Sequence, residues 1–359
     1  MPRPLQYDRV LCGAVLALMF FGILMVFSAT AGGPMASLRY VIKQLVAVAV
    51  GLAAMRWLMY FDYQQLRRQK TVIVALGVTV ILLVVALALG ETANTHRFIP
   101  VGNLFSIQPS EIAKLALILF LAFYLESRTE QIDDWRTLGG AALIVGVLCA
   151  LVLGGRDLGT AFSLVVLAGA VFWFAGLPVR YFAAAGLLGL PLLGLAIWIE
   201  PYRVKRFFIF LNPESDPLGA GFQILQSEIA VGTGGLLGQG LMQGRQKMRF
   251  LPEAHTDFIF AVIGEEAGLI GGCLIALAFA VILWRGLSTA LRAPDRFGCY
   301  LAGGLTAMIV CQAMLNLGVV LAMLPTKGLP LPFISYGGTA MVTALAAAGV
   351  LLNVSQHRT

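Results

Sequence analysis

Ionisable residues crowd against a long apolar run in the stretch FLPEAHTDFIF, residues 250–260. Glu253, His255 and Asp257 come directly before this run, which has the composition and length of a membrane helix. Thr256 or Asp257 could cap the helix, which is the commonest use of such residues at this position. A cap does not account for the ionisable neighbours. Acids beside a membrane are costly unless they face a cavity or a partner, so we predict a functional site here.

A second cluster lies in THRFIPVGNLFSIQPSEIAK, residues 95–114. Its proline-serine pair is typical of a helix start, and Glu111 falls in the first turn, where a carboxylate meets the positive end of the helix dipole. Glu111 and Lys114 are three residues apart, so they share a helical face and can pair. Either the two merely neutralise each other, or Lys114 faces a polar cavity and Glu111 orients it. Arg97 could add a second cation.

Two further stretches have ordinary explanations. Asp157 in GGRDLGTAF, residues 154–162, is predicted to cap the helix that follows rather than to bind a substrate. The basic residues Arg245, Lys247 and Arg249 follow a glycine-rich segment and could bind either lipid phosphate or a substrate.

The last stretch is LPTKGLPLPFISYGGT, residues 324–339. Its three prolines exclude a regular helix, and irregular backbone near membrane depth is tolerated only where it is buried in protein or lines a cavity. Lys327, Ser335 and Tyr336 either line such a cavity or belong to a plain loop.

Composition indicates which elements must hold these residues. Hydrophobic residues make up 59% of the chain and charged residues 12%, about half the charged share of a soluble domain. Apolar runs near bilayer length recur from end to end, which predicts an all-α, polytopic integral membrane protein. The net charge of +7 then indicates contact with anionic membrane lipids rather than nucleic acid. The cysteines lie in apolar runs without a C-x-x-C pair, as expected for helix packing.

Hydropathy predicts about ten transmembrane helices. They are expected at residues 10–29, 41–60, 71–90, 111–126, 139–153, 158–176, 181–199, 258–284, 298–323 and 338–354. An even number places both termini on one side, and the distribution of Lys and Arg in the short loops makes that side cytoplasmic. We therefore predict one membrane domain over residues 1–359, with a large extracytoplasmic loop at 200–257 between the seventh and eighth helices. Polar residues gather on this outer side, which favours one site there.

These stretches together resemble the SEDS family (shape, elongation, division and sporulation) of polytopic membrane proteins. The matching motifs are IQPSEIAK at 107–114, DLGT at 157–160, PEAHTDFIFAVIGEE at 252–266 and GLPLPFISYGGT at 328–339. The resemblance covers nearly the whole chain. Gly155 and Arg156 stand where the family usually has Gln-Pro before DLGT. The short segment before the first helix is similar to that of elongation-type members, because division-type members often carry a longer one.

The resemblance implies a peptidoglycan glycosyltransferase that polymerises lipid II at the outer face of the bacterial cytoplasmic membrane. It also implies a partner, a class B penicillin-binding protein that performs transpeptidation. Carried onto this chain, the essential acid of the family's H-T-D motif is Asp257, and the family's charged pair is Glu111 and Lys114.

This chemistry needs one base and several cations. Making a β-linked glycan from an α-linked lipid diphosphate implies inversion, in which Asp257 takes the proton of the acceptor 4-hydroxyl. Cations stabilise the departing diphosphate. No cofactor is required, although a divalent cation, Mg²⁺ or Mn²⁺, could bridge Asp257 and the diphosphate instead. The expected substrate-binding residues are Glu111, Lys114, Arg97, Arg206, Arg249, Glu253, His255, Lys327 and Ser335.

Three other functions fit part of the pattern. A lipid II flippase would use the same cavity and cations but needs no base. An ion-coupled transporter would use Glu265 and Glu266, which lie inside a predicted membrane helix, and would need water access from both sides. A scaffold without enzymatic activity leaves the polar outer residues unexplained. The polymerase accounts for most of the pattern.

Overall fold

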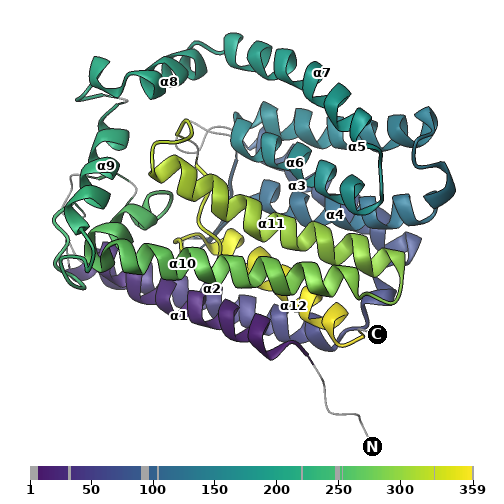
Figure 1. Ribbon diagram of the computed structural model, residues 1–359, viewed down its shortest axis with the longest axis horizontal. Coiled ribbons are helices and arrows are strands. Elements are labelled where there is room, and N and C mark those ends of the chain that lie inside the picture. Colours follow the sequence, from purple (N-terminus) through teal and green to yellow (C-terminus); the bar gives the residue numbers. More distant parts are fainter. Residues whose placement is uncertain are drawn as a thin grey trace, which may run out of the picture.

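The computed structural model is a bundle of long helices (Figure 1). It describes residues 7–30, 34–89, 97–102, 105–219, 221–246, 251–252, 254–326 and 328–357. Lipid offers the backbone no hydrogen-bond partners, so a chain this apolar satisfies its N–H and C=O groups within helices. The predicted all-α, polytopic fold class is confirmed.

Ten helices of the described chain occupy the ten predicted spans. They are α1 (Arg9–Ala29), α2 (Pro34–Tyr60), α3 (Gln69–Ala88), α4 (Pro109–Glu126), α5 (Trp135–Gly154), α6 (Leu158–Phe174), α7 (Val179–Trp198), α10 (Ile259–Leu291), α11 (Arg296–Val320) and α12 (Gly338–Ser355). Eight of them have the length and apolar character of a membrane span. The other two are α6, which has 17 residues, and α4, which carries the Glu111 and Lys114 pair.

Shorter elements lie between these spans. The helices are α8 (Pro201–Leu211) and α9 (Phe222–Gly234), the strands are β1 (Ile99–Val101) and β2 (Phe105–Ile107), and the 3-10 turns are η1 (Tyr63–Gln65), η2 (Thr129–Gln131) and η3 (Pro213–Ser215). The strands form an antiparallel hairpin in which Pro100 pairs with Ser106. α9 packs along α10, and its residues Ile224 and Ala230 are buried.

Both ends of the described chain lie at one end of the bundle (Figure 1). The Asp8 backbone N–H donates to Ser355 Oγ at 3.1 Å, which ties the start of α1 to the end of α12. Arg285 Nε donates to Asp8 Oδ2 at 2.7 Å. This arrangement agrees with an even number of crossings. α9 and the start of α10 lie at the opposite end.

The centre of the bundle is formed by α11 and α12. Their spans are 67% and 72% buried, whereas the α7 span is 0% buried. α12 packs along α2, and α11 packs against α4, α6 and α10. α7 and α8 arch along one side of the bundle (Figure 1). The motif-bearing helices α4, α6 and α10 therefore all pack against α11, in the best-buried part of the bundle.

Candidate active site

Asp257 lies just before α10, at the end of the bundle opposite the termini. The N-cap position of α10 belongs to Phe258, whose side chain is buried. The prediction that Thr256 or Asp257 caps this helix is therefore wrong, because the chain buries the Phe258 ring before it turns into the helix. Asp257 is half-buried, and its backbone carbonyl accepts a 2.8 Å hydrogen bond from Asn316 Nδ2.

Gly328 brings Asp257 and Arg97 together. A Cβ placed on this glycine would lie 3.1 Å from Asp257 Oδ2 and 3.8 Å from Arg97 Nη1. Carboxylate and guanidinium therefore approach the same point from two distant parts of the sequence. Arg97 Nη2 also donates to the Arg156 carbonyl at 3.0 Å, and its buried Nε has no partner among the described residues. A cation held here can stabilise negative charge that develops beside Asp257.

The Arg156 backbone explains how this chain departs from the usual Gln-Pro. Arg156 has φ 62°, a left-handed conformation that is uncommon for a residue with a side chain. A proline at this position could not adopt it, because its ring fixes φ near about −65°. The turn at Arg156 presents the carbonyl that Arg97 Nη2 contacts.

Asp157 caps α6, as predicted. Its carboxylate accepts hydrogen bonds from Thr160 N at 3.0 Å and from Thr160 Oγ1 at 2.8 Å. It lines a small pocket together with Arg97, Ser110 and Gly155. Asp157 therefore has a structural partner for both carboxylate oxygens and also lies near Arg97.

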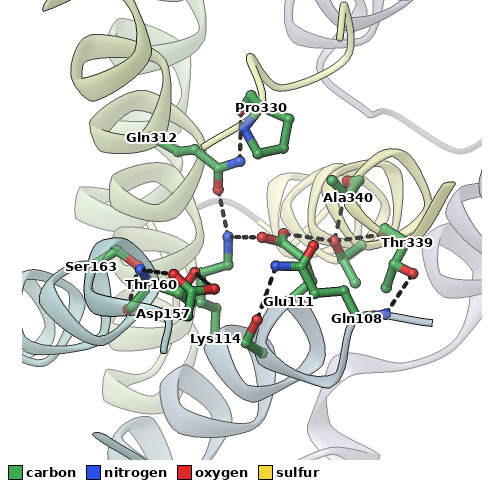
Figure 2. A network of polar contacts seen from close by, with 12 residues as sticks. Gln108, Glu111, Lys114, Asp157, Thr160, Ser163, Gln312, Pro330, Thr339 and Ala340 are labelled. Carbon is green, nitrogen blue, oxygen red and sulfur yellow. Dashed lines mark hydrogen bonds and ion pairs between the residues drawn. The ribbon is translucent and has the colours of Figure 1, made fainter. Parts of the chain in front are cut away.

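Glu111 and Lys114 form the centre of a buried polar network (Figure 2). Lys114 Nζ lies 2.8 Å from Glu111 Oε1 and donates to Gln312 Oε1 at 2.6 Å. Gln312 Nε2 in turn donates to the Pro330 carbonyl at 2.8 Å. The predicted pairing on one helical face is present. Both charged residues are only 1% exposed, so Lys114 faces protein partners here, and a substrate could touch it only after these contacts part.

The segment between α11 and α12 has no regular helix, as its prolines predict. It is buried: Leu329, Leu331 and Phe333 are each 1% exposed. Ser335 Oγ accepts the Leu331 N–H at 2.8 Å, so this hydroxyl closes a local turn. Ser335 was expected to bind substrate, but it is 3% exposed and its hydroxyl contacts Leu331 within the segment.

His255 belongs to a cluster of three rings beside Asp257. Its ring centroid lies 4.6 Å from that of Tyr40 on α2 and 5.5 Å from that of Tyr336. The Tyr336 N–H donates to the His255 carbonyl at 2.9 Å. Burial raises the pKa of the Tyr336 phenol above its ordinary value. These contacts join the 328–337 segment to the chain just before α10.

Glu265 and Glu266 hold the glycine-rich segment after α9. Glu265 Oε1 accepts the Arg245 N–H at 2.7 Å, and Glu266 Oε2 accepts the Met242 N–H at 3.0 Å. Both side chains are 1% exposed. An ion-coupled transporter would need these carboxylates open to water, so the structure disfavours that alternative.

The helical hydrogen bonding of α10 is interrupted at Gly268, which has φ 63°, and the same segment hydrogen-bonds to the backbone there. The Glu265 and Glu266 carbonyls accept N–H groups from Gln239 at 2.9 Å and Gly240 at 3.1 Å. Broken helices are tolerated at membrane depth when neighbouring backbone satisfies the freed groups. The glycines of this segment approach α10 closely: a Cβ added at Gly234 or Gly238 would clash with the α10 backbone.

The other expected site residues are spread around this centre. Arg206 Nη1 on α8 donates to the Thr326 carbonyl at 3.4 Å, which brings α8 to the segment that follows α11. Arg249, Glu253 and Lys327 lie outside the described residues. No group of three His, Cys, Asp or Glu in the described chain could form a metal site. Asp257 could hold Mg²⁺ together with substrate oxygens, which is a common arrangement for this ion.

Tyr40, Gln312 and Asn316 belong to the site but were not predicted from the sequence. Gln312 and Asn316 are four residues apart within an apolar helix, so they share one face, and both are buried. Polar side chains inside a membrane helix usually face the bundle interior and hydrogen-bond there. Their spacing was the available signal. Tyr40 carried none, because tyrosine is common at membrane boundaries.

Comparison with known proteins identifies the fold. Residues 8–359 match the cell cycle protein family of FtsW, RodA and SpoVE. Stage V sporulation protein E of Bacillus subtilis is 43% identical, over 98% of this chain and 97% of its own length. The probable peptidoglycan glycosyltransferase FtsW of Geobacter metallireducens is 42% identical, over 98% of this chain and 95% of its own.

Two solved structures agree over the whole chain. A chain of a peptidoglycan synthase complex, described as coordinating polymerization and crosslinking, has a TM-score of 0.82 and 31% identity, covering 98% of both chains. The rod shape determining protein RodA of Thermus thermophilus has a TM-score of 0.74 and 28% identity, covering 99% of both. The chain therefore belongs to the FtsW/RodA/SpoVE family, the SEDS family that its motifs resemble.

Proposed function

We propose that this protein is a peptidoglycan glycosyltransferase that polymerises lipid II into glycan strands, with Asp257 as the base of an inverting reaction. The observation that carries the proposal is the approach of Asp257 Oδ2 and Arg97 Nη1 to Gly328, which pairs a carboxylate with a cation at one point. The names of its FtsW relatives support the same activity.

In the proposed reaction, Asp257 takes the proton from the 4-hydroxyl of the acceptor sugar. The acceptor oxygen attacks the anomeric carbon of the donor on the face opposite the lipid diphosphate. The new carbon–oxygen bond forms as the bond to the diphosphate breaks, and the diphosphate leaves with the electron pair. One carboxylate is enough, because inversion needs no covalent intermediate. A positioned base contributes about 100- to 10,000-fold to such a rate.

The cations have the complementary task. Arg97 lies beside Asp257 at Gly328 and is the best-placed described cation for the departing diphosphate. Arg206, Arg249 and Lys327 are proposed to extend this positive surface, and His255 and Glu253 to contact the sugars. Lys114 joins them if its contacts with Glu111 and Gln312 part when substrate binds. A divalent cation held by Asp257 would supply further charge for the leaving diphosphate when bound.

We place the site at the outer face of a bacterial cytoplasmic membrane, with both termini in the cytoplasm. The excess of Lys and Arg in the loops at the terminal end of the bundle supports this orientation. Residues 200–257 then form an extracytoplasmic loop within one membrane domain. A membrane-impermeant maleimide should label a cysteine at the exposed position 215 from outside intact cells. Labelling only from the cytoplasmic side would contradict this orientation.

A class B penicillin-binding protein is the proposed partner. The similar chain of a peptidoglycan synthase complex supports a partner that crosslinks the strands. Elongation is the proposed role, supported by the match to a rod shape determining protein. The curated relatives named FtsW and SpoVE keep division and sporulation as the competing roles.

The decisive test is reconstitution of the purified protein in liposomes that contain lipid II. We expect glycan polymer on a gel, with more product when the penicillin-binding protein is present. Movement of labelled lipid II between leaflets, without polymer under either condition, would favour the flippase and contradict the polymerase.

A methyl group at Gly328 should slow the reaction without unfolding the protein. The Gly328→Ala side chain would lie 3.1 Å from Asp257 Oδ2, tighter than an ordinary contact, and would displace the carboxylate or Arg97. A displacement of about 1 Å can cost about 100-fold in rate, so we expect a loss of tenfold to 100-fold in polymerisation.

Gly337→Ala is the matched control, because its added Cβ would lie 3.5 Å from Ala340 Cβ, an ordinary contact, in the same segment. Both variants should keep the thermal midpoint of the parent within a few degrees. Equal polymerisation by the two variants would show that Asp257 and Arg97 do not act together at Gly328.

A further inference from the structure

Asn316 on α11 joins the two segments that build the proposed site. Its side-chain amide group, Nδ2, donates to the Asp257 carbonyl and to the Leu329 carbonyl, each at 2.8 Å. An amide group has two N–H donors, so both are used. Asn316 is 1% exposed, and its Oδ1 has no partner among the described residues.

The two carbonyls belong to the two sides of the site. One is that of Asp257 itself, the residue before the N-cap of α10. The other belongs to Leu329, the residue after Gly328. A Cβ added at Gly328 would lie beside both Asp257 Oδ2 and Arg97 Nη1. One buried side chain therefore sets the separation between the backbone that carries the acid and the backbone that faces it.

Gln312, one helical turn earlier on α11, continues the same contact. Its Nε2 holds the Pro330 carbonyl at 2.8 Å, and its Oε1 accepts from Lys114 Nζ at 2.6 Å. Gln312 and Asn316 thus hold consecutive carbonyls, those of Pro330 and Leu329, from one face of α11, which is one of the two most buried spans. Of these two residues, only Asn316 also donates a hydrogen bond to the Asp257 carbonyl.

We infer that Asn316 is a positioning residue: it fixes Asp257 relative to Gly328 and Arg97 and does not touch the substrate. The inference rests on the proposed function for its effect on rate, and on the two hydrogen bonds alone for its effect on structure. Loss of both bonds would let the Asp257 carboxylate move away from the reacting hydroxyl, while Arg97 keeps its contact with the Arg156 carbonyl. The rate constant should fall and the affinity for lipid II should persist.

The chain offers a matched control at its other end. Asn353 on α12 is 2% exposed, and its Nδ2 likewise donates to two carbonyls, that of Met59 at 2.9 Å and that of Phe61 at 2.8 Å. It lies near the end of α12, two residues before Ser355, whose Oγ accepts the Asp8 N–H at the end of the bundle that carries the termini. Asn353→Leu therefore removes two hydrogen bonds of the same kind. It should cost a similar amount of stability without disturbing the proposed site.

The test compares Asn316→Leu with Asn353→Leu in full-length protein. We expect both variants to lose thermal stability, but only Asn316→Leu to lose about 100-fold in kcat per folded molecule, with KM for lipid II within a few-fold of the parent. That loss is the size expected for misplacing a catalytic group by about 1 Å. A kcat for Asn316→Leu within a few-fold of that of Asn353→Leu would overturn the inference.

Hydrogen exchange separates this inference from the proposed function. Asn316→Leu should increase exchange of backbone amides in residues 254–261 and 328–337 together, and Asn353→Leu should leave both segments protected. This readout holds even for a protein that makes no polymer. Unchanged protection of either segment would overturn the inference by itself. If Asn316→Leu does not fold, Asn316→Ser keeps one donor and should free one of the two segments only.

Discussion

Asp257→Asn is expected to abolish polymerisation of lipid II while the protein stays folded. Asparagine keeps the size of the side chain but cannot take a proton, so the rate should fall by about 100- to 10,000-fold, the contribution of a general base. The backbone of residue 257 should keep its place, because its carbonyl is held by Asn316 Nδ2 and the helix N-cap is Phe258. Binding of lipid II should persist, since the cations are unchanged.

The measurement is polymer formed per folded molecule, with the thermal midpoint and lipid II binding recorded on the same preparation. Asp295→Asn is the control: this acid caps α11 at the opposite end, accepting the Gly298 N–H at 2.6 Å and the Tyr63 hydroxyl at 2.6 Å. It should lower stability modestly and leave polymerisation within a few-fold. Polymerisation by Asp257→Asn within a few-fold of the parent would remove Asp257 from the reaction and favour the flippase.

The membrane helices could be predicted closely from sequence because the bilayer enforces one solution. An apolar run of about 20 residues must be helical in lipid, where no water satisfies the backbone. The seventh span, predicted at 181–199, is found at Val179–Trp198, although none of its residues is buried against the protein. Hydropathy is therefore sufficient for such elements, whatever their tertiary contacts.

Elements that depend on tertiary contacts escaped prediction. The hairpin of β1 and β2 has three residues in each strand, too few to show an alternating pattern. The break at Gly268 lies within one predicted span, residues 258–284, and the segment after α9 supplies N–H groups to the Glu265 and Glu266 carbonyls there. Nothing in the local sequence at Gly268 indicates that partner.

In the candidate site, too, some features could be predicted from the sequence and others depend on tertiary contacts. Residue type alone was enough to single out Asp257, Arg97, Glu111 and Lys114, because charges are rare and costly in a membrane protein. Their arrangement was not predictable. Asp257 and Arg97 approach each other only because the segment after α11 returns to place Gly328 beside both. Lys114 was predicted either to neutralise Glu111 or to face a polar cavity, and the structure adds Gln312, not singled out in the sequence, whose Oε1 accepts a hydrogen bond from Lys114 Nζ.

Lys114→Met is expected to destabilise the protein strongly. Lys114 and Glu111 are each 1% exposed, and Nζ lies 2.8 Å from Oε1, so the single variant leaves a buried carboxylate without its cation. Breaking a buried pair from one side typically costs about 3–5 kcal/mol. Gln312 Oε1 would also lose the hydrogen bond that Lys114 Nζ donates to it. We expect a thermal midpoint lower by many degrees and a reduced yield of folded protein in detergent.

The double variant Glu111→Gln/Lys114→Met separates stability from function. Replacing both members of a buried pair by neutral residues of similar volume is often neutral or stabilising, so most of the lost stability should return. Activity should not return with it if Lys114 reaches the diphosphate when substrate binds, because no cation remains at this position. Recovery of both stability and polymerisation would instead limit the pair to a structural role, in which Glu111 and Lys114 satisfy each other beneath the segment that Gln312 and Asn316 hold.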